Sequence, residues 1–170
     1  MDAAQGTPQR ALPLRMDRSP ISPQTQPEGA AFHITITVPG PPRAKGAGRV
    51  GVAGGRGMIF IDPKTRSELA MIRMMAEQAM AGRAPYEGPV ILRLCAWREV
   101  PASLSKRKRA LALEGRLFPV TRPDFDNHYK MVDALNKIVW RDDAQVVSVV
   151  GHKRYAETPR LVIDVRSMAT

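Results

Sequence analysis

The chain has 170 residues, a hydrophobic share of 44% and a formal net charge of +10. This length allows one ordinary domain with a real core. The single cysteine excludes an internal disulfide framework, which is typical of a reducing compartment. No apolar stretch approaches the ~20 residues that cross a bilayer, so we expect a soluble, cytoplasmic protein. The positive charge favours a polyanionic partner, above all nucleic acid, with a merely solvated basic surface as the alternative.

Residues 1–30 are rich in Pro, Gln, Ser and Thr and have no hydrophobic period, so we expect a disordered tail ahead of one domain at 31–167. Apolar residues at every second position predict a strand over 32–38. The Gly-rich stretch that follows is interpreted as a mobile loop that closes on phosphates, with a flexible, merely soluble hairpin as the alternative. The cations of this stretch are Arg43, Lys45, Arg49 and Arg56.

The middle of the chain predicts a short strand, a helix and a longer strand. The short strand lies over 58–61, and the helix over 63–81 begins after Asp62, because aspartate is a favoured N-cap and proline is favoured at the first helical position. The long strand over 89–100 contains Cys95, which is interpreted as a small core residue. The methionines of the helix are interpreted as core or dimer packing: Met71, Met74, Met75 and Met80.

The segment at 103–110 combines serines with four consecutive cations and starts a short helix. Its composition favours phosphate contact and an ordinary solvated face about equally. A strand-like piece over 118–121 follows and leads into an acidic part of the chain.

Asp124 and Asp126 open a helix that we expect to run over 124–139, because acidic residues interact favourably with the positive end of a helix. Its apolar residues follow the spacing of a buried stripe: Val132, Leu135, Ile138 and Val139. A second stripe is charged and is explained, when taken alone, by weak surface ion pairs. It consists of Asp126, Lys130, Asp133 and Lys137.

A second acidic pair, Asp142-Asp143, directly precedes a strand predicted to begin near residue 145. We expect the helix to pack across its neighbouring strands and to bring Asp124, Asp126 and Asp143 together at one edge. Three unpaired carboxylates at close range would raise one another's pKa, a conflict that a divalent cation resolves. Mg²⁺ and Mn²⁺ prefer such oxygen ligands, and the histidines lack the paired spacing of a zinc site. Carboxylates that hold a metal in a strongly basic chain favour phosphodiester hydrolysis.

An ordered string of short motifs runs through this part of the chain: RPDFDNHYK from Arg122 to Lys130, DALN from Asp133 to Asn136, DDAQV from Asp142 to Val146, and Lys153. A weaker match lies in VPGPPRAK from Val38 to Lys45. With these motifs the sequence resembles the RusA-type Holliday-junction resolvases, small endodeoxyribonucleases of bacteria and their prophages. The resemblance covers most of 31–165 and departs from the family pattern at Phe125, where an aliphatic residue is common.

The resemblance implies that Asp124, Asp126 and Asp143 bind the catalytic metal, and that Lys130 is an essential lysine one helical turn beyond Asp126. Physically, Lys130 would neutralise the scissile phosphate or stabilise charge in the transition state. The alternative for Lys130 is a salt bridge to Asp126. Supporting roles, such as holding a carboxylate in place, are expected for Asn127 and Asp142.

The resemblance also implies a Mg²⁺-dependent homodimer, α/β in fold, that nicks opposed strands of a four-way junction symmetrically. A two-fold dimer agrees with a physical argument, because one chain offers one acidic cluster and resolution needs two matched cuts. The residues expected to contact the DNA backbone are Arg43, Lys45, Arg49, Lys153 and Arg154.

We therefore expect a single α/β (α+β) domain in which a mixed sheet is packed by the helices over 63–81 and 124–139. The predicted strands lie near 32–38, 58–61, 89–100, 145–155 and 160–166. Two alternatives stay open. One is a junction- or RNA-binding protein without chemistry, whose carboxylates are structural, and the other is a nuclease with a different specificity, such as a flap or general nuclease.

Overall fold

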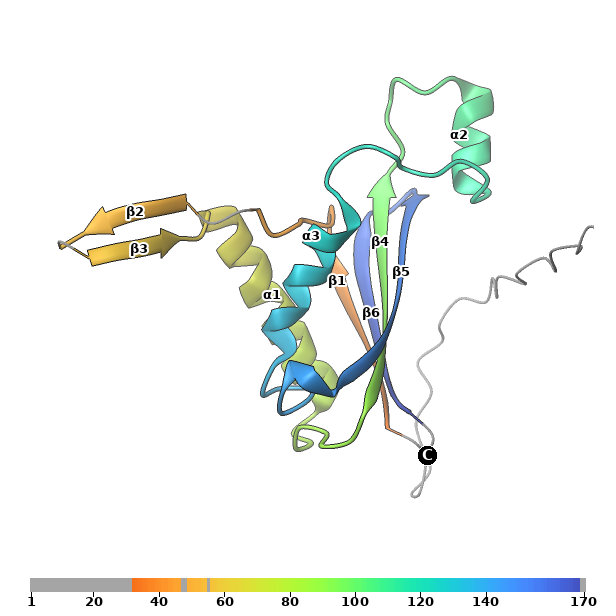
Figure 1. Ribbon diagram of the computed structural model, residues 1–170. Coiled ribbons are helices and arrows are strands. Elements are labelled where there is room, and N and C mark those ends of the chain that lie inside the picture. The colour runs from red at the N-terminus through yellow and green to blue at the C-terminus, as the bar shows by residue number, and fades with distance from the viewer. Residues whose placement is uncertain (1–31, 47–48, 55, 169–170) are drawn as a thin grey trace, which may run out of the picture.

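The computed structural model describes residues 32–46, 49–54 and 56–168, and the tail predicted at 1–30 lies outside this part of the chain. The main sheet consists of β1 (His33–Pro39), β4 (Val90–Glu99), β5 (Val146–Ala156) and β6 (Arg160–Ser167). Their order is β1–β6–β4–β5 (Figure 1). β6 pairs antiparallel with both β1 and β4, whereas β4 and β5 are parallel. The predicted α+β architecture with a mixed sheet is thereby confirmed.

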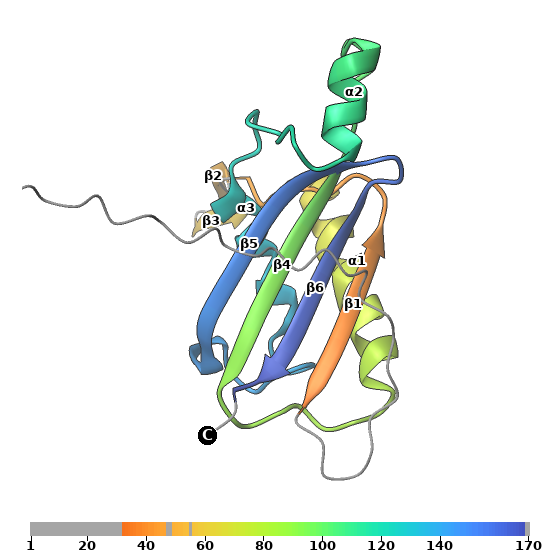
Figure 2. The same ribbon diagram turned by 90° about the vertical axis from the view of Figure 1, so that its right-hand side faces the viewer.

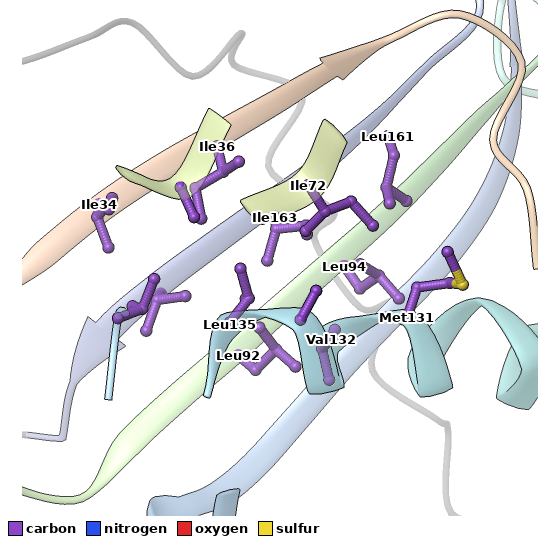
Figure 3. Close-up of a cluster of buried hydrophobic side chains, with 14 of the residues drawn as sticks. Ile34, Ile36, Ile72, Leu92, Leu94, Met131, Val132, Leu135, Leu161 and Ile163 are labelled. Carbon is purple, nitrogen blue, oxygen red and sulfur yellow. The ribbon is translucent and has the colours of Figure 1, made fainter. Parts of the chain in front are cut away.

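One face of the sheet carries the core, and no described helix covers the other face (Figure 2). The helix α1 (Pro63–Met80) packs on the core face, together with α3 (Phe125–Tyr129) and the 3₁₀ helix η1 (Lys130–Leu135). Alternate strand residues and the inner sides of these helices meet there, and burying each large aliphatic side chain stabilises the fold by ~1.5–3 kcal/mol. Figure 3 shows part of this cluster, including Ile34, Ile36, Ile72, Leu92, Leu94, Met131, Leu135, Leu161 and Ile163.

α1 confirms the helix predicted over 63–81. The Asp62 side chain accepts a hydrogen bond from the backbone N–H of Thr65 (3.1 Å) and caps the helix as expected. Of the interpretation of its methionines as core or dimer packing, the core part holds for some of them only, because the helix presents one side to the sheet, and dimer packing stays a prediction. Two of them are buried or partly buried, Met80 and Met75, and two are exposed, Met71 and Met74.

Cys95 lies on the uncovered face of the sheet, because its neighbours in β4, Leu94 and Ala96, are the residues that point into the core. The prediction that it is a core residue is therefore wrong, and the thiol is half-buried. Burial raises the pKa of Cys95 to about 11, opposed by the charges of Arg154 and Arg160. The thiol thus stays protonated at neutral pH and is a poor nucleophile.

The stretch after β1 contains a hairpin of β2 (Arg49–Ala53) and β3 (Arg56–Phe60), which projects from the domain (Figure 1). Gly54 lies between the strands at φ +59°, a conformation that glycine adopts without steric cost. The strand expected near 58–61 is therefore present, but the prediction that it belongs to the main sheet is wrong. It pairs with its sequence neighbour because a short turn makes that local pairing the simplest one.

The single helix expected over 124–139 is wrong. α3 has five residues, η1 tightens into 3₁₀ geometry, and Asn136 is extended. The Trp140 indole N–H donates to the Asn136 side-chain oxygen (2.8 Å), and the Lys137 N–H donates to the Trp140 carbonyl (2.7 Å). These local bonds, between residues three and four positions apart, replace helical ones and end the helix early. The predicted apolar stripe nevertheless faces the core, with Val132, Leu135 and Val139 buried and Ile138 partly buried.

Two short helices complete the described chain. α2 (Lys106–Leu113) confirms the helix predicted in the basic segment, and η2 (Asp143–Gln145) lies just before β5. The piece at 118–121, expected to be strand-like, is irregular. No helix in the part of the chain that the structure describes is long and apolar enough to cross a membrane.

Candidate active site

The start of α3 presents two carboxylates to solvent. Asp124 is the N-cap residue, but its side chain makes no capping hydrogen bond and has no partner among the described residues. Asp126 accepts a hydrogen bond from the Lys130 ammonium group (2.9 Å), which lowers the pKa of Asp126. Lys130 also donates to the side-chain oxygen of Asn127 (3.0 Å). The acidic group and the lysine thus lie together on one exposed turn, as the spacing predicts.

Asn127 contacts the lysine rather than a carboxylate. We expected it to hold an acidic side chain, but its amide oxygen is an acceptor that fixes the Lys130 ammonium group. An ammonium group held by a carboxylate and an amide oxygen has a defined position and can still donate a third hydrogen bond.

The segment after β1 is attached to α3 by two contacts and to η1 by a third. His128 is fully buried, and its Nδ1 lies 3.0 Å from the Arg43 carbonyl oxygen, to which it donates. The backbone N–H of Lys45 donates to the Asn127 carbonyl (2.9 Å), and the Lys45 ammonium group pairs with Asp133 (2.7 Å). Burial lowers the pKa of His128, so its imidazole is neutral. These contacts place the predicted DNA contacts Arg43 and Lys45 beside the acidic turn.

The other predicted DNA contacts have different positions. The Lys153 ammonium group donates to the carbonyls of Thr121 (2.9 Å) and Pro123 (2.9 Å), so it holds the chain that enters Asp124. Arg154 lies near the ring of Phe118 on the uncovered side of the sheet. Arg49 belongs to β2, and its side chain is outside the described part.

Sequence reasoning missed Arg98, which binds the same loop as Lys153. Its guanidinium group donates to both the carbonyl and the hydroxyl oxygen of Thr121 (3.1 Å each). A lone arginine at the end of a strand carries no signal for this role. Two cations from neighbouring strands therefore fix the loop that precedes the acidic turn.

Phe125 fixes the position of α3 against β5. Its ring lies over Gly151, where an added Cβ would collide with the Phe125 Cζ. Only glycine allows this approach, because any side chain would displace the ring. Beside the ring lies a hollow of about 340 Å³, which is lined by Phe125, Asp126, Tyr129 and Val149.

The second acidic pair occupies a different corner of the domain. Asp142 caps η2 by accepting from the Ala144 N–H (2.9 Å). Gln145 accepts from the N–H groups of Arg141 and Asp142 and donates to the carbonyls of Tyr86 and Gly88. Asp142 and Gln145 thus form a capping box, and the D-x-x-Q spacing is the sequence signal for it. Asp143 is exposed and has no partner among the described residues.

The two acidic pairs do not meet within one chain. Asp143 precedes Val146 at the start of β5, whereas Lys153, which holds the loop before Asp124, lies seven residues further along the strand. Seven residues of a strand span about 23 Å. Across the described residues, no group of three His, Cys, Asp or Glu side chains lies close enough to hold a metal. The predicted convergence of Asp143 with Asp124 and Asp126 in a single chain is therefore wrong.

The cause of this separation is the parallel pairing of β4 and β5. After β4, the chain must return along the whole sheet before β5 can begin, since parallel neighbours start at the same end. α3 and η1 make this return, as Figure 1 shows. Asp124 consequently lies at the beginning of the return and Asp143 at its end.

Fold and site together define a small basic α+β domain with exposed carboxylates among cationic side chains, a combination typical of proteins that act on nucleic acid. Residues 39–166 match the family Endodeoxyribonuclease RusA, and the chain belongs to this family. It is also similar to "Uncharacterized protein YqaN" of Bacillus subtilis (strain 168), with 34% identity over 139 residues, which cover 80% of this chain and 97% of that protein. The resemblance found in the sequence is thus confirmed, and with it the class of endodeoxyribonuclease.

Proposed function

We propose that this protein is a Mg²⁺-dependent endonuclease that resolves four-way DNA junctions by hydrolysing two phosphodiester bonds symmetrically. The observation that carries the proposal is the exposed turn in which Asp124, Asp126 and Lys130 lie together in a chain of net charge +10. A family of endodeoxyribonucleases matches the residues that contain this turn.

Asp124, Asp126 and Asp143 would hold the cation. The carboxylates of Asp124 and Asp143 fit this role, because neither has a partner among the described residues and both are exposed. Oxygen ligands of this kind favour Mg²⁺, with Mn²⁺ as a substitute. When bound by these carboxylates, such an ion would supply an activated water and neutralise phosphate charge. Lys130 donates to a phosphate oxygen and stabilises the charge that develops there.

Two copies of the chain complete the site in this proposal. β5 is an edge strand, and between its start and the part beside α3 it exposes Val147, Val149 and Val150, by 54%, 42% and 38%. Exposed apolar residues on an edge strand favour contact with another chain. In a two-fold contact centred on these valines, the start of one β5 lies beside the middle of the other. Asp143 of one copy then approaches Asp124 and Asp126 of the second copy, and the dimer contains two such sites.

Cleavage of linear, flap and four-way DNA, each with and without Mg²⁺, tests the proposal. We expect paired nicks in the four-way substrate only, dependent on Mg²⁺. Asp126→Asn should bind this substrate but not cut it, and cutting at the wild-type rate would contradict the assignment. Salt-sensitive binding without Mg²⁺-dependent products would instead support a junction- or RNA-binding protein, and equal cutting of flap or linear DNA would support another nuclease specificity.

A further inference from the structure

α2 carries four consecutive cations, Lys106, Arg107, Lys108 and Arg109, and all four side chains are exposed. The helix projects beyond the end of the main sheet in both views (Figures 1 and 2). Only Ala112 is buried, so almost the whole surface of the helix is available to a partner.

This arrangement of charge is unfavourable for the isolated chain. Cations in the first turn oppose the helix dipole, and Lys106 and Arg109, three positions apart, are like charges that lie side by side on the helix surface. The first turn has no acidic residue, and none of the four cations has an ion pair among the residues that the structure describes. The nearby Glu114 pairs with Arg116 instead (3.2 Å). The charge of the four α2 cations is therefore available to an anionic partner.

The cations also lie on all sides of the helix. Successive residues of an α-helix are rotated by about 100°, so four consecutive side chains surround its axis. Phosphates on both flanks of the helix would match such a distribution, and a flat anionic surface would contact only part of it. The major groove of DNA is about 12 Å wide, admits an α-helix, and has a phosphate backbone on each side.

We propose that α2 enters the major groove of one DNA arm and contacts the phosphates on both sides. This inference rests on the proposed function, because it takes DNA as the substrate, and it adds a contact separate from the acidic turn. The contact involves phosphates, so it holds the arm in place without selecting a base sequence.

The chain after α2 connects this helix firmly to the acidic turn. The N–H groups of Arg116 and Leu117 donate to the Leu111 carbonyl (2.8 and 3.1 Å) and close the end of the helix. Further on, the Arg154 guanidinium group lies 5.1 Å from the centre of the Phe118 ring, and Lys153 holds Thr121. A DNA arm bound by α2 would therefore have a defined position relative to Asp124.

The salt dependence of binding tests this contact. The triple variant Arg107→Gln, Lys108→Gln, Arg109→Gln is compared with Lys64→Gln, Arg66→Gln, Arg73→Gln, which removes the same charge from the exposed side of α1. Binding of the full chain to a four-way junction is measured in EDTA, where no cutting occurs, across a series of salt concentrations. Each lost phosphate contact reduces the slope of log K against log salt by about 0.9, so we expect the α2 variant to reduce it by about 2.7 per copy, or about 5.4 for a bound dimer.

The α1 variant should change this slope little. Equal slopes in the two variants, or a wild-type slope in the α2 variant, would overturn the inference and leave the proposed function intact. If the wild-type chain itself neither binds nor cuts the junction, the proposed function is contradicted, and this inference with it. Removal of repelling charges should not lower the melting temperature of the α2 variant. If that variant fails to fold, Arg107→Gln alone should still reduce the slope by about 0.9 per copy, or about 1.8 for a bound dimer, and an unchanged slope would overturn the inference.

Discussion

The start of α3 and the corner at η2 are two acidic regions of similar composition and different structure. Each has two aspartates at the beginning of a short helix. In each, one carboxylate is bound within the chain, Asp126 by Lys130 and Asp142 by the capping box, and one is exposed without a partner among the described residues, Asp124 and Asp143. The comparison shows that neighbouring aspartates can have separate roles. The two regions lie at opposite ends of the segment that joins β4 to β5.

Replacing each aspartate of the η2 corner separately tests most strongly whether Asp142 and Asp143 have different roles. Asp143→Ala should reduce junction cutting by more than ~100-fold, because even the outer-shell partners of a metal site cost 10- to 100-fold. Its melting temperature should stay unchanged. Asp142→Ala should lower the free energy of unfolding by about 0.5–2 kcal/mol through loss of the cap and should retain most of the cutting. Single-turnover cleavage and urea denaturation measure both effects, and a reversed pattern would exchange the two roles.

Lys130 decides whether the α3 region is catalytic or only a surface ion pair. Lys130→Met should reduce the cleavage rate by about 100-fold or more, since it removes a positioned donor to the phosphate. Lys137→Met is the matched control, because Lys137 is an exposed lysine of the same segment with no contact to Asp126. Binding in EDTA should be similar for both variants. Cleavage at the wild-type rate by Lys130→Met would show that Lys130 only forms a salt bridge with Asp126.

Gly151 tests how closely α3 must approach β5. Gly151→Ala places a Cβ against the Phe125 ring and should lower the free energy of unfolding by about 1–3 kcal/mol. Gly46→Ala, where an added Cβ meets nothing within 4 Å, should have a much smaller effect. Phe125→Leu should recover part of the loss in the double variant. Equal stability of the two alanine variants would show that the contact is not tight.

The smallest expected effect concerns pH. Because burial lowers the pKa of His128 in the folded protein, the unfolded chain binds a proton first as the pH falls. The contribution of neutral His128 to the free energy of unfolding should therefore be fully present above a pH of about 6.5. Below that pH it should decrease toward the folded pKa, by at most about 1.4 kcal/mol per pH unit. His128→Gln should show a weaker decrease in denaturation series between pH 5 and 7, with His152 supplying the remainder. An identical slope in variant and wild type would contradict this.

Local signals account for what the sequence predicts correctly. The alternation in β1, the cap and proline of α1, and the four-residue spacing of Asp126 and Lys130 depend on near neighbours only. The end of the helix near Asn136 involves a hydrogen bond from the Trp140 indole, four residues further on, which the apolar spacing of the segment does not reveal. The separation of Asp143 depends on parallel pairing between β4 and β5, which a short window of sequence does not encode. The RusA motif string identifies the acidic residues without giving their distances.

The two acidic regions can be tested together by mixing inactive variants. Asp126→Asn and Asp143→Asn, each unable to cut, are combined under conditions that allow the subunits to exchange. If each metal site takes Asp126 from one copy and Asp143 from the other, every mixed dimer contains one intact site, and a random mixture regains about a quarter of the wild-type sites. We predict that Mg²⁺-dependent nicking of a four-way junction returns on mixing. A mixture that stays inactive although mixed dimers form would contradict the shared site.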